Sequence, residues 1–525
     1  MKKLKLSFFI LFTACFFPVY GQNGYTNYKT MLDRIDKLTH SYPAICSSHS
    51  LVRTSGGYDI VVITMGKGDI HNKPAIAVLG GVEANYMLGR EIALGLAESV
   101  VKNNEQLLDK ITFYIFPDVN PDATSQYFSN LLYERTINSR PTDNDVDFLT
   151  DEDPFEDLNG DGIISHIRIK DPSGRFTLNH DDERVLDEAN VSLGETGGYL
   201  YFTEGIDNDD DGKFNEDCEG GVNFNRNFTY EYEEFGLNAG LHPVSEPETK
   251  AVADFLYERF NIYAVFAFGP QDNLGQPENM APGKDENNVS DKDLNKLVSD
   301  RYHEITGLKG SPIQVKAPGN FMEWVYYHYG RYSFSTPGWW FPYEKGKNPE
   351  AEFLKYADKN NIPGVFIPWK EVNHPGFPGK KAEIGGIRPF VMTNPPADSV
   401  NKITAKNIAF ITNIAEMHPD PEFLDIATEN IGNDIYRIEL KLHNKGVFAT
   451  LPQVAERNVW TRIMRLSIEP AKGQEIISGQ KVNRIDRIEG GESAEFSWLI
   501  KGKGPVAITA GAVNTGIIMT TVDLK

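Results

Sequence analysis

Four segments of the sequence carry polar and aromatic side chains of types that could bind a metal ion or a carboxylate. In the first, a Gly-Gly turn after an apolar run is followed by Glu83 and Tyr86. Glu83 offers a carboxylate that could coordinate a metal ion, although one carboxylate does not make a tight zinc site. The third segment contains Asn225 and Arg226, and a guanidinium binds a carboxylate through two parallel hydrogen bonds. The four segments are Leu79–Glu91, Phe116–Asp122, Gly220–Phe228 and Met322–Trp340.

These segments lie among alternating helical and strand patterns. Strands that alternate with helices predict an α/β domain, with a mixed, mostly parallel sheet and helices on both faces. We assign this domain to residues 22–417, and the segment 141–221 to a long acidic loop insertion. Helical spacing covers 25–39, 88–101 and 246–260, and strand-like runs cover 59–65, 75–79, 111–116 and 262–268.

The pattern changes to period two beyond a Pro-rich hinge at 418–425. Short runs of alternating apolar and polar residues, separated by turn residues, predict a small β-sandwich over 418–525. The runs are 436–442, 460–468, 494–500, 506–512 and 517–522.

In their order and surroundings, the four segments resemble the zinc metallocarboxypeptidases of the carboxypeptidase A type over about residues 24–395. Members of that family carry a His and a Glu in a Gly-Gly-X-His-x-x-Glu turn, a second His after a later strand, and a general-base Glu. Zinc catalysis needs three protein ligands and an open position for a water, whose pKa the metal lowers to about 7. The resemblance implies this fold and, with an intact site, release of C-terminal residues from peptides.

This chain departs from the family at each of those chemical positions. Glu83 and Tyr86 stand where the first His and the Glu belong, and Gly269 stands where the second His belongs. Pro337 stands where the general-base Glu belongs, and a proline cannot take a proton. Since glycine has no ligand atom, we expect zinc to be absent although the family implies it.

The positions that hold the substrate in the family are mostly retained. The resemblance implies that Asn225 and Arg226 grip the C-terminal carboxylate of a peptide. It also implies that Arg135, or less surely Arg140, polarises the scissile carbonyl, and that Tyr326 closes over the bound residue. Two alternatives remain open: Arg226 forms a buried ion pair with the acidic insertion, or Tyr326 is a core side chain.

The acidic insertion contains loops with oxygen ligands at alternating positions, a pattern that suits calcium. The bidentate Glu at the last position of an EF-hand is missing, so these are not EF-hands, and solvated acidic loops are the alternative. Bound calcium would pin the insertion beside Asn225 and Arg226. The candidate ligands are Asp207, Asp209, Asp211, Glu216 and Asp217 in one loop and Asp157, Asn159 and Asp161 in another.

No other catalytic pattern competes with these segments. His180 and Glu183 have the His-x-x-Glu spacing, but they lie in a polar acidic stretch without a preceding Gly-Gly turn. The sequence has no His-Glu-x-x-His and no Gly-x-Ser-x-Gly motif. We therefore find no replacement metal site or nucleophile.

Composition and the N-terminus indicate an exported protein. Lys and Arg number 52 and Asp and Glu number 74, so the net charge is −22, which argues against nucleic acid and anionic membranes as partners. Three lysines precede an apolar run too short to span a membrane, which predicts a signal peptide over 1–21, cleaved near Gly21-Gln22. We expect a secreted, periplasmic or cell-surface protein, in which a Cys46–Cys218 disulfide is permitted but not predicted.

Three hypotheses for function follow. The first is a non-catalytic member that binds the C-terminus of a peptide or protein. The second is an active zinc carboxypeptidase with a rearranged site. The third is a calcium-stabilised extracellular interaction module with a vestigial cleft.

Overall fold

The computed structural model describes residues 24–525 except 144–147, 149, 152, 209–213, 216–219 and 279. The predicted signal peptide lies outside the described residues, and so do Cys218 and four candidate calcium ligands: Asp209, Asp211, Glu216 and Asp217. Cys46 is buried and free.

The described helices and strands follow the order that the sequence predicts for an α/β domain with a C-terminal β region. The longer helices are α1 Tyr28–Ser41, α2 Leu88–Asn103, α5 Pro247–Glu258, α6 Val289–Thr306, α8 Pro349–Lys359 and α9 Val400–Ala415. The short ones are α3 Leu107–Lys110, α4 Pro121–Thr124 and α7 Phe321–Trp324.

The first domain is built on a mixed six-stranded sheet of order β1-β2-β4-β3-β9-β10. The strands are β1 Cys46–Arg53, β2 Asp59–Met65, β3 Ala75–Leu79, β4 Thr112–Phe116, β9 Ile262–Phe268 and β10 Tyr332–Thr336. Strands β4, β3, β9 and β10 are parallel neighbours, whereas β1 and β2 pair antiparallel at one edge.

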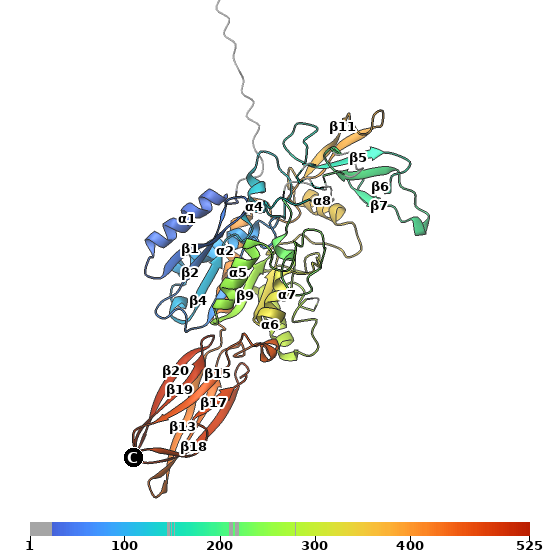
Figure 1. Ribbon diagram of the computed structural model, residues 1–525. Helices are drawn as coiled ribbons and strands as arrows, with labels where there is room; N and C mark the ends of the chain where they lie inside the picture. Colours follow the sequence, from blue (N-terminus) through green and yellow to red (C-terminus); the bar gives the residue numbers. More distant parts are fainter. Residues whose placement is uncertain are drawn as a thin grey trace, which may run out of the picture.

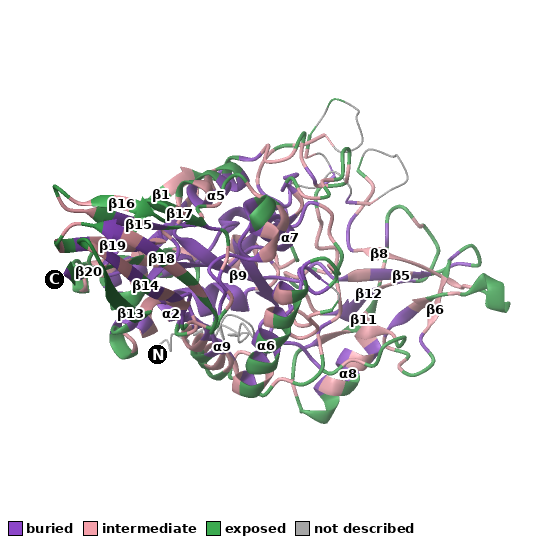
Figure 2. Cartoon of the chain, turned by 90° about the horizontal axis from the view of Figure 1, so that it is seen from below, coloured by how far each residue is buried: buried purple, intermediate pink, exposed green. Residues whose placement is uncertain are grey.

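Helices cover both faces of this sheet, as predicted (Figure 1). Side chains of β3 alternate between two hydrophobic cores, with Ile76 and Val78 in one and Ala75, Ala77 and Leu79 in the other. The first core also contains α1, α2, α6 and α9, and the second contains α5 and α7. Because both faces are covered, the central strands read as continuous apolar runs, and β9 is buried throughout (Figure 2).

The acidic segment is not a long loop, and this prediction was wrong. It contains four strands that join two later ones in a second antiparallel sheet, of order β11-β12-β5-β8-β6-β7 (Figure 1). Ile167 and Ile169 of β5 point into a small core while their neighbours remain partly exposed. These strands were not predicted because each has only three to seven residues and lies between Asp- and Gly-rich turns. They are β5 His166–Lys170, β6 Phe176–Leu178, β7 Leu186–Glu188, β8 Tyr199–Thr203, β11 Phe366–Val372 and β12 Ala382–Ile387.

The C-terminal region contains two four-stranded antiparallel sheets, of order β13-β14-β18-β16 and β17-β15-β19-β20, that share one hydrophobic core. The predicted Pro-rich hinge partly forms a strand, because β13 begins at Pro421 on a sheet edge, where proline needs no ladder partner. The strands are β13 Pro421–Gly432, β14 Ile435–Asn444, β15 Met464–Pro470, β16 Glu475–Ser478, β17 Val482–Ile485, β18 Ser493–Lys501, β19 Gly504–Ala512 and β20 Gly516–Leu524.

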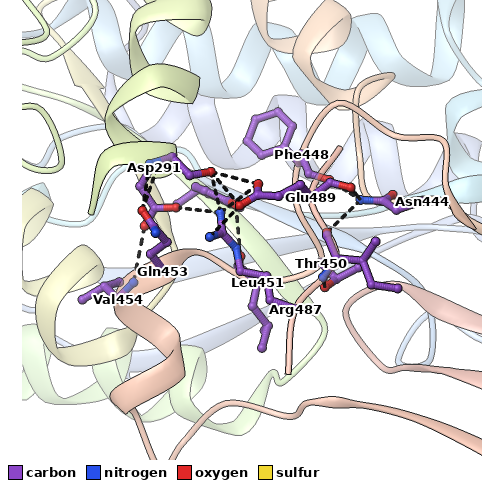
Figure 3. A network of polar contacts seen from close by, with 12 residues as sticks. Asp291, Asn444, Phe448, Thr450, Leu451, Gln453, Val454, Arg487 and Glu489 are labelled. Atoms are coloured by element: carbon purple, nitrogen blue, oxygen red, sulfur yellow. Dashed lines mark hydrogen bonds and ion pairs between the residues drawn. The ribbon is translucent and has the colours of Figure 1, made fainter. Parts of the chain in front are cut away.

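A buried polar network joins this region to the first domain (Figure 3). Arg487 donates from Nε to the Leu451 carbonyl at 2.7 Å, and its Nη2 lies 3.4 Å from the carboxylate of Asp291 on α6. The Asp291 side chain is fully buried and that of Arg487 nearly so. Burial raises the pKa of Asp291 to about 6. The charge of Asp291 therefore depends on a residue from the other domain.

We expect Arg487→Ala to lower the free energy of unfolding by about 3–5 kcal/mol, because the change leaves a buried carboxylate without its cation. Urea unfolding at neutral pH measures the loss. Arg437→Ala is the matched control in the same region, since Arg437 pairs with Glu429 at the surface and should change stability by at most about 1 kcal/mol. Equal effects of the two substitutions would contradict the role given to Arg487.

Candidate functional site

Three parallel strands end at one edge of the main sheet and bring three sequence-predicted positions together. Glu83 follows β3, Gly269 follows β9 and Pro337 follows β10. A Cβ built on Gly269 would lie 3.6 Å from the Cβ of Glu83, and the Gly269 amide donates to the Thr336 carbonyl at 3.2 Å. In α/β sheets, ligands bind outside these carboxyl ends.

The glycine turn before Glu83 is required by a close approach of two chain segments. Gly81 has φ +72°, and a Cβ there would come within 2.4 Å of a carboxylate oxygen of Asp118. Asp118 is fully buried and accepts from Arg90 Nε at 2.7 Å. This buried ion pair therefore stabilises the packing of the turn.

Glu83 is buried, and amides hold both of its carboxylate oxygens. Asn223 donates to one oxygen at 2.7 Å and Asn225 donates to the other at 3.1 Å. Burial raises the pKa of Glu83, while these two bonds and the charge of Arg226 oppose the rise. The carboxylate is thus fixed by neutral donors.

Asn225 connects this carboxylate to the rest of the site. Its amide nitrogen also donates to the Gln271 side chain at 2.6 Å, and its oxygen accepts from the backbone amide of Phe321 at 3.1 Å. Asn223 and Gln271 were missed in the sequence, although each lies two residues from a position that was recognised. A carboxamide two residues from a recognised position could have pointed to each of them.

Tyr86, which stands where the family has its Glu ligand, is half-buried beside acidic groups. Burial and the charges of Glu83 and Glu134 raise the pKa of Tyr86 well above its ordinary value. Glu134 in turn accepts from the Asn85 side chain at 2.7 Å and from the Phe390 backbone amide at 2.6 Å. A phenol held in its protonated form makes a poor replacement for a carboxylate ligand.

Arg226 lies beside this cluster, and its side chain makes one hydrogen bond to the described residues. It occupies the end of a short 3₁₀ turn, Phe224–Arg226, and is partly exposed. Its Nη1 donates to the Leu237 carbonyl at 2.9 Å, and it pairs with no carboxylate among the residues that the structure describes. The alternative of a buried ion pair therefore finds no support in that part of the chain.

The two arginines proposed to polarise a carbonyl are both engaged elsewhere. Arg135 is buried and donates to the carbonyls of Ile137 and Asn138 at 3.0 and 2.9 Å, within its own loop. Arg140 forms a 2.6 Å ion pair with the buried carboxylate of Glu246. Both side chains fix the loop that precedes the acidic segment.

Tyr326 does not lie at the cleft, which corrects the prediction that it closes over a ligand. Its side chain is fully buried, and its hydroxyl donates to Asp291 at 2.9 Å, in the network that joins the two domains. The alternative reading as a core tyrosine agrees with this position.

The candidate calcium loop at Asp157–Asp161 is closed by its own amides. Asp157 accepts from the amides of Gly160 and Gly162, each at 2.7 Å, and Asn159 accepts from the amide of Asp161 at 2.9 Å. Among the residues that the structure describes, no three His, Cys, Asp or Glu side chains form a group suited to a metal ion. Calcium stays a prediction for these loops and for Asp207.

Polar and apolar side chains near Val222 and Phe224 surround a small gap that is too narrow to hold a water molecule. Glu248, at the start of α5, is 2% exposed, and neither carboxylate oxygen has a hydrogen-bond partner among the described residues. Burial, together with the charges of Asp122 and Glu246, raises the pKa of Glu248 from 4.5 to about 7. The lining residues are Asn120, Asn138, Val222, Phe224, Glu246, Glu248 and Thr249.

Two parts of the chain match models of protein families. The family model described as zinc carboxypeptidase matches residues 31–148, and a domain of unknown function matches residues 420–523. A carboxypeptidase B from the crayfish Astacus astacus is 25% identical over 110 residues, which are 20% of this chain and 36% of the relative. The match thus spans about a third of the curated relative.

Solved carboxypeptidase structures also align with the chain. Bovine thrombin-activatable fibrinolysis inhibitor, in complex with tick carboxypeptidase inhibitor, is 17% identical with a TM-score of 0.42, covering 74% of this chain and 96% of that one. Carboxypeptidase A from Helicoverpa armigera is 13% identical with a TM-score of 0.42, covering 74% and 73%. Within the described residues, no helix combines the length and apolar character needed to cross a membrane.

We expect Glu248→Gln to remove a pH dependence of folding stability. The raised pKa means that folding favours the protonated carboxyl, so its contribution is complete below pH 4.5 and is lost as the pH rises through about 7. The full difference corresponds to about 3 kcal/mol at most.

Urea unfolding between pH 4.5 and 8 tests this, with the exposed Glu258→Gln on the same helix as the control. The wild type and the control should both lose stability over that range relative to Glu248→Gln. Parallel curves for all three proteins would show that Glu248 does not titrate as described.

Proposed function

Because the chain belongs to the carboxypeptidase A-type metallocarboxypeptidases, we propose that it is a non-catalytic member that binds the C-terminus of a peptide or protein. One observation carries the proposal. The carboxylate at the first metal position has both oxygens bound by the amides of Asn223 and Asn225. The neighbouring strand ends contribute Gly269 and Pro337, which offer neither a ligand nor a base.

The residues at the strand ends do not fit a catalytic zinc ion. Zinc in peptidases takes nitrogen and oxygen ligands from three side chains. Here Glu83 offers the one carboxylate among the three matched positions, and a metal would have to displace two amide hydrogen bonds to reach it. The side chains that surround it, Asn225 and Gln271, satisfy each other at 2.6 Å.

The binding half of the site is better preserved. Arg226 presents a partly exposed guanidinium with one described hydrogen bond, so its fork of donors remains free for a carboxylate. It lies close enough to Glu83 for the two charges to interact. A ligand carboxylate at Arg226 would therefore sit beside the position where a scissile bond lies in active relatives.

Export and calcium binding complete the proposal. The N-terminal sequence supports a secreted or cell-surface location after cleavage near Gly21-Gln22, and the acidic loops support calcium as a structural ion. The active zinc carboxypeptidase is the competing function, supported by family membership alone.

We expect Arg226→Ala to weaken binding of peptides with a free C-terminus by about 30-fold or more, because the ligand carboxylate loses its paired cation. Arg226→Lys should recover only part of the affinity, since an ammonium cannot form the two-bond fork. Fluorescence anisotropy of a labelled peptide measures both effects.

Two controls accompany this measurement. Arg175→Ala removes an exposed arginine that directly precedes β6 and should leave binding unchanged. The amidated peptide should bind wild type as weakly as the free peptide binds Arg226→Ala. Equal affinity of wild type for free and amidated peptides would refute C-terminus recognition.

We expect the purified mature chain to contain no stoichiometric zinc, and the triple variant Glu83→His, Tyr86→Glu, Gly269→His to gain about one zinc per chain. The φ of Gly269 permits a side chain, and an added Cβ meets Glu83 only at ordinary contact distance, so the histidine fits. Elemental mass spectrometry after dialysis gives the metal content.

The matched control carries Gln, Gln and Asn at the same three positions, which cannot supply the same ligand set. Zinc in the wild type would favour the active carboxypeptidase. A zinc-free triple variant would mean that the strand ends differ from a metal site by more than their side chains.

A further inference from the structure

A loop next to Arg226 exposes large apolar side chains to solvent. Within seven residues, Phe235 is 100% exposed, Leu241 is 78% exposed and Leu237 is 68% exposed. Single exposed apolar residues are ordinary on protein surfaces, but a local group of them marks an interaction site. We call residues 231–244 the apolar loop.

The backbone of the apolar loop is held in conformations that cost free energy. Glu231, Phe235, Asn238 and Val244 all have left-handed φ values, between +49° and +61°. Val244 is β-branched and Phe235 is bulky, and such residues rarely adopt this conformation. Conformations of this kind persist where the surrounding structure imposes them, and they concentrate at binding sites.

Buried polar side chains impose the conformation of this loop. Asn227 is fully buried and donates to the carbonyls of Ala239 and His242 at 2.7 and 3.1 Å. The Tyr232 hydroxyl donates to the Gly240 carbonyl at 2.6 Å. The loop therefore presents its apolar side chains from a fixed framework, which limits the conformational entropy lost on binding.

The same chain segment positions the loop and the carboxylate-binding arginine. Arg226 donates from Nη1 to the carbonyl of Leu237 at 2.9 Å, so its guanidinium lies directly against the loop. The backbone amide of Asn223 donates to the carbonyl of Asn238 at 2.9 Å. The exposed apolar group and Arg226 thus form one continuous surface.

Charge indicates which ligand suits this surface. Glu231, Glu233 and Glu234 are exposed on the loop beside Phe235. Arg226 provides a positive charge beside Leu237, in the middle of the loop. A complementary ligand carries a terminal carboxylate, apolar side chains before it and a basic residue farther from the end.

We propose that the apolar loop binds the residues that precede the C-terminus of a peptide or protein, and that it selects apolar and basic side chains there. This inference rests on the proposed function, because it requires the terminal carboxylate to lie at Arg226. It adds a preference for ligand sequence that the carboxylate alone does not give.

The test compares two labelled peptides with free C-termini, one with Lys, Phe and Leu before the last residue and one with Ser and Gly there. The loop variant carries Phe235→Ser, Leu237→Ser and Leu241→Ser, which leave the backbone carbonyl that Arg226 uses. The control variant carries Val191→Ser and Leu193→Ser, at exposed apolar positions outside the loop. Circular dichroism and melting curves confirm that all variants fold.

We expect the loop variant to bind the Lys-Phe-Leu peptide at least about tenfold more weakly than wild type and the Ser-Gly peptide unchanged. Arg226→Ala should weaken both peptides. If Arg226→Ala weakens both and the loop variant changes neither, the inference fails while the proposed function stands.

Three further outcomes overturn the inference. If neither Arg226→Ala nor amidation affects binding, the inference fails together with the proposed function. An equal loss in the control variant would mean that the apolar contact is unspecific. A wild-type dimer that the loop variant abolishes in sedimentation, with unchanged peptide affinity, would make the loop a contact between two copies of this chain.

Discussion

The arrangement of the site depends on one buried carboxylate and the amides that hold it. Glu83 emerges where three parallel strands end, and a charge in that position needs donors because water is excluded. Asn223 and Asn225 supply them from the segment that follows the acidic insertion. The position of Glu83 thereby fixes that segment, and with it the backbone from which Arg226 projects.

The strands that create this position could be predicted from the sequence. The predicted boundaries of β2, β3 and β9 agree with the structure to the residue, since β3 and β9 are uninterrupted apolar runs and β2 is mostly apolar. That Glu83 and Gly269 meet could be predicted only from the resemblance to a family, because no local pattern links residues so far apart. The amides of Asn223 and Asn225 were not predicted as partners of Glu83, because their nearness in sequence to a recognised position does not show which group they contact.

The errors share a physical cause. Tyr326 was assigned to ligand binding from the resemblance to the family, yet an aromatic side chain suits a core as well as a binding site, and its partner Asp291 lies 35 residues away. The second sheet was missed because strands such as β6 and β7 have three residues each and are stabilised by pairing with one another. In both cases, partners that are distant in sequence decided the outcome over local preference.

The arginines show how the same side chain is used in three ways. Arg135 donates to the backbone carbonyls of its own loop, and Arg487 neutralises a buried carboxylate between domains. Arg226 is held by a single described bond, and its remaining donors form no ion pair in the part of the chain that the structure covers. Fixing a guanidinium through one bond while leaving the others free is the arrangement that a carboxylate receptor needs.

The strand ends also show how the protein itself stabilises the one charge at the matched positions. A metal site holds its ligands together because the ion offsets the cost of burying their charges. Here the matched positions hold one carboxylate, one phenol, a glycine and a proline, so a single negative charge remains to be stabilised. Two carboxamides stabilise it, and Gln271 satisfies the second hydrogen of Asn225. The side chains of Glu83 and Asn225 therefore find their hydrogen-bond partners within the protein.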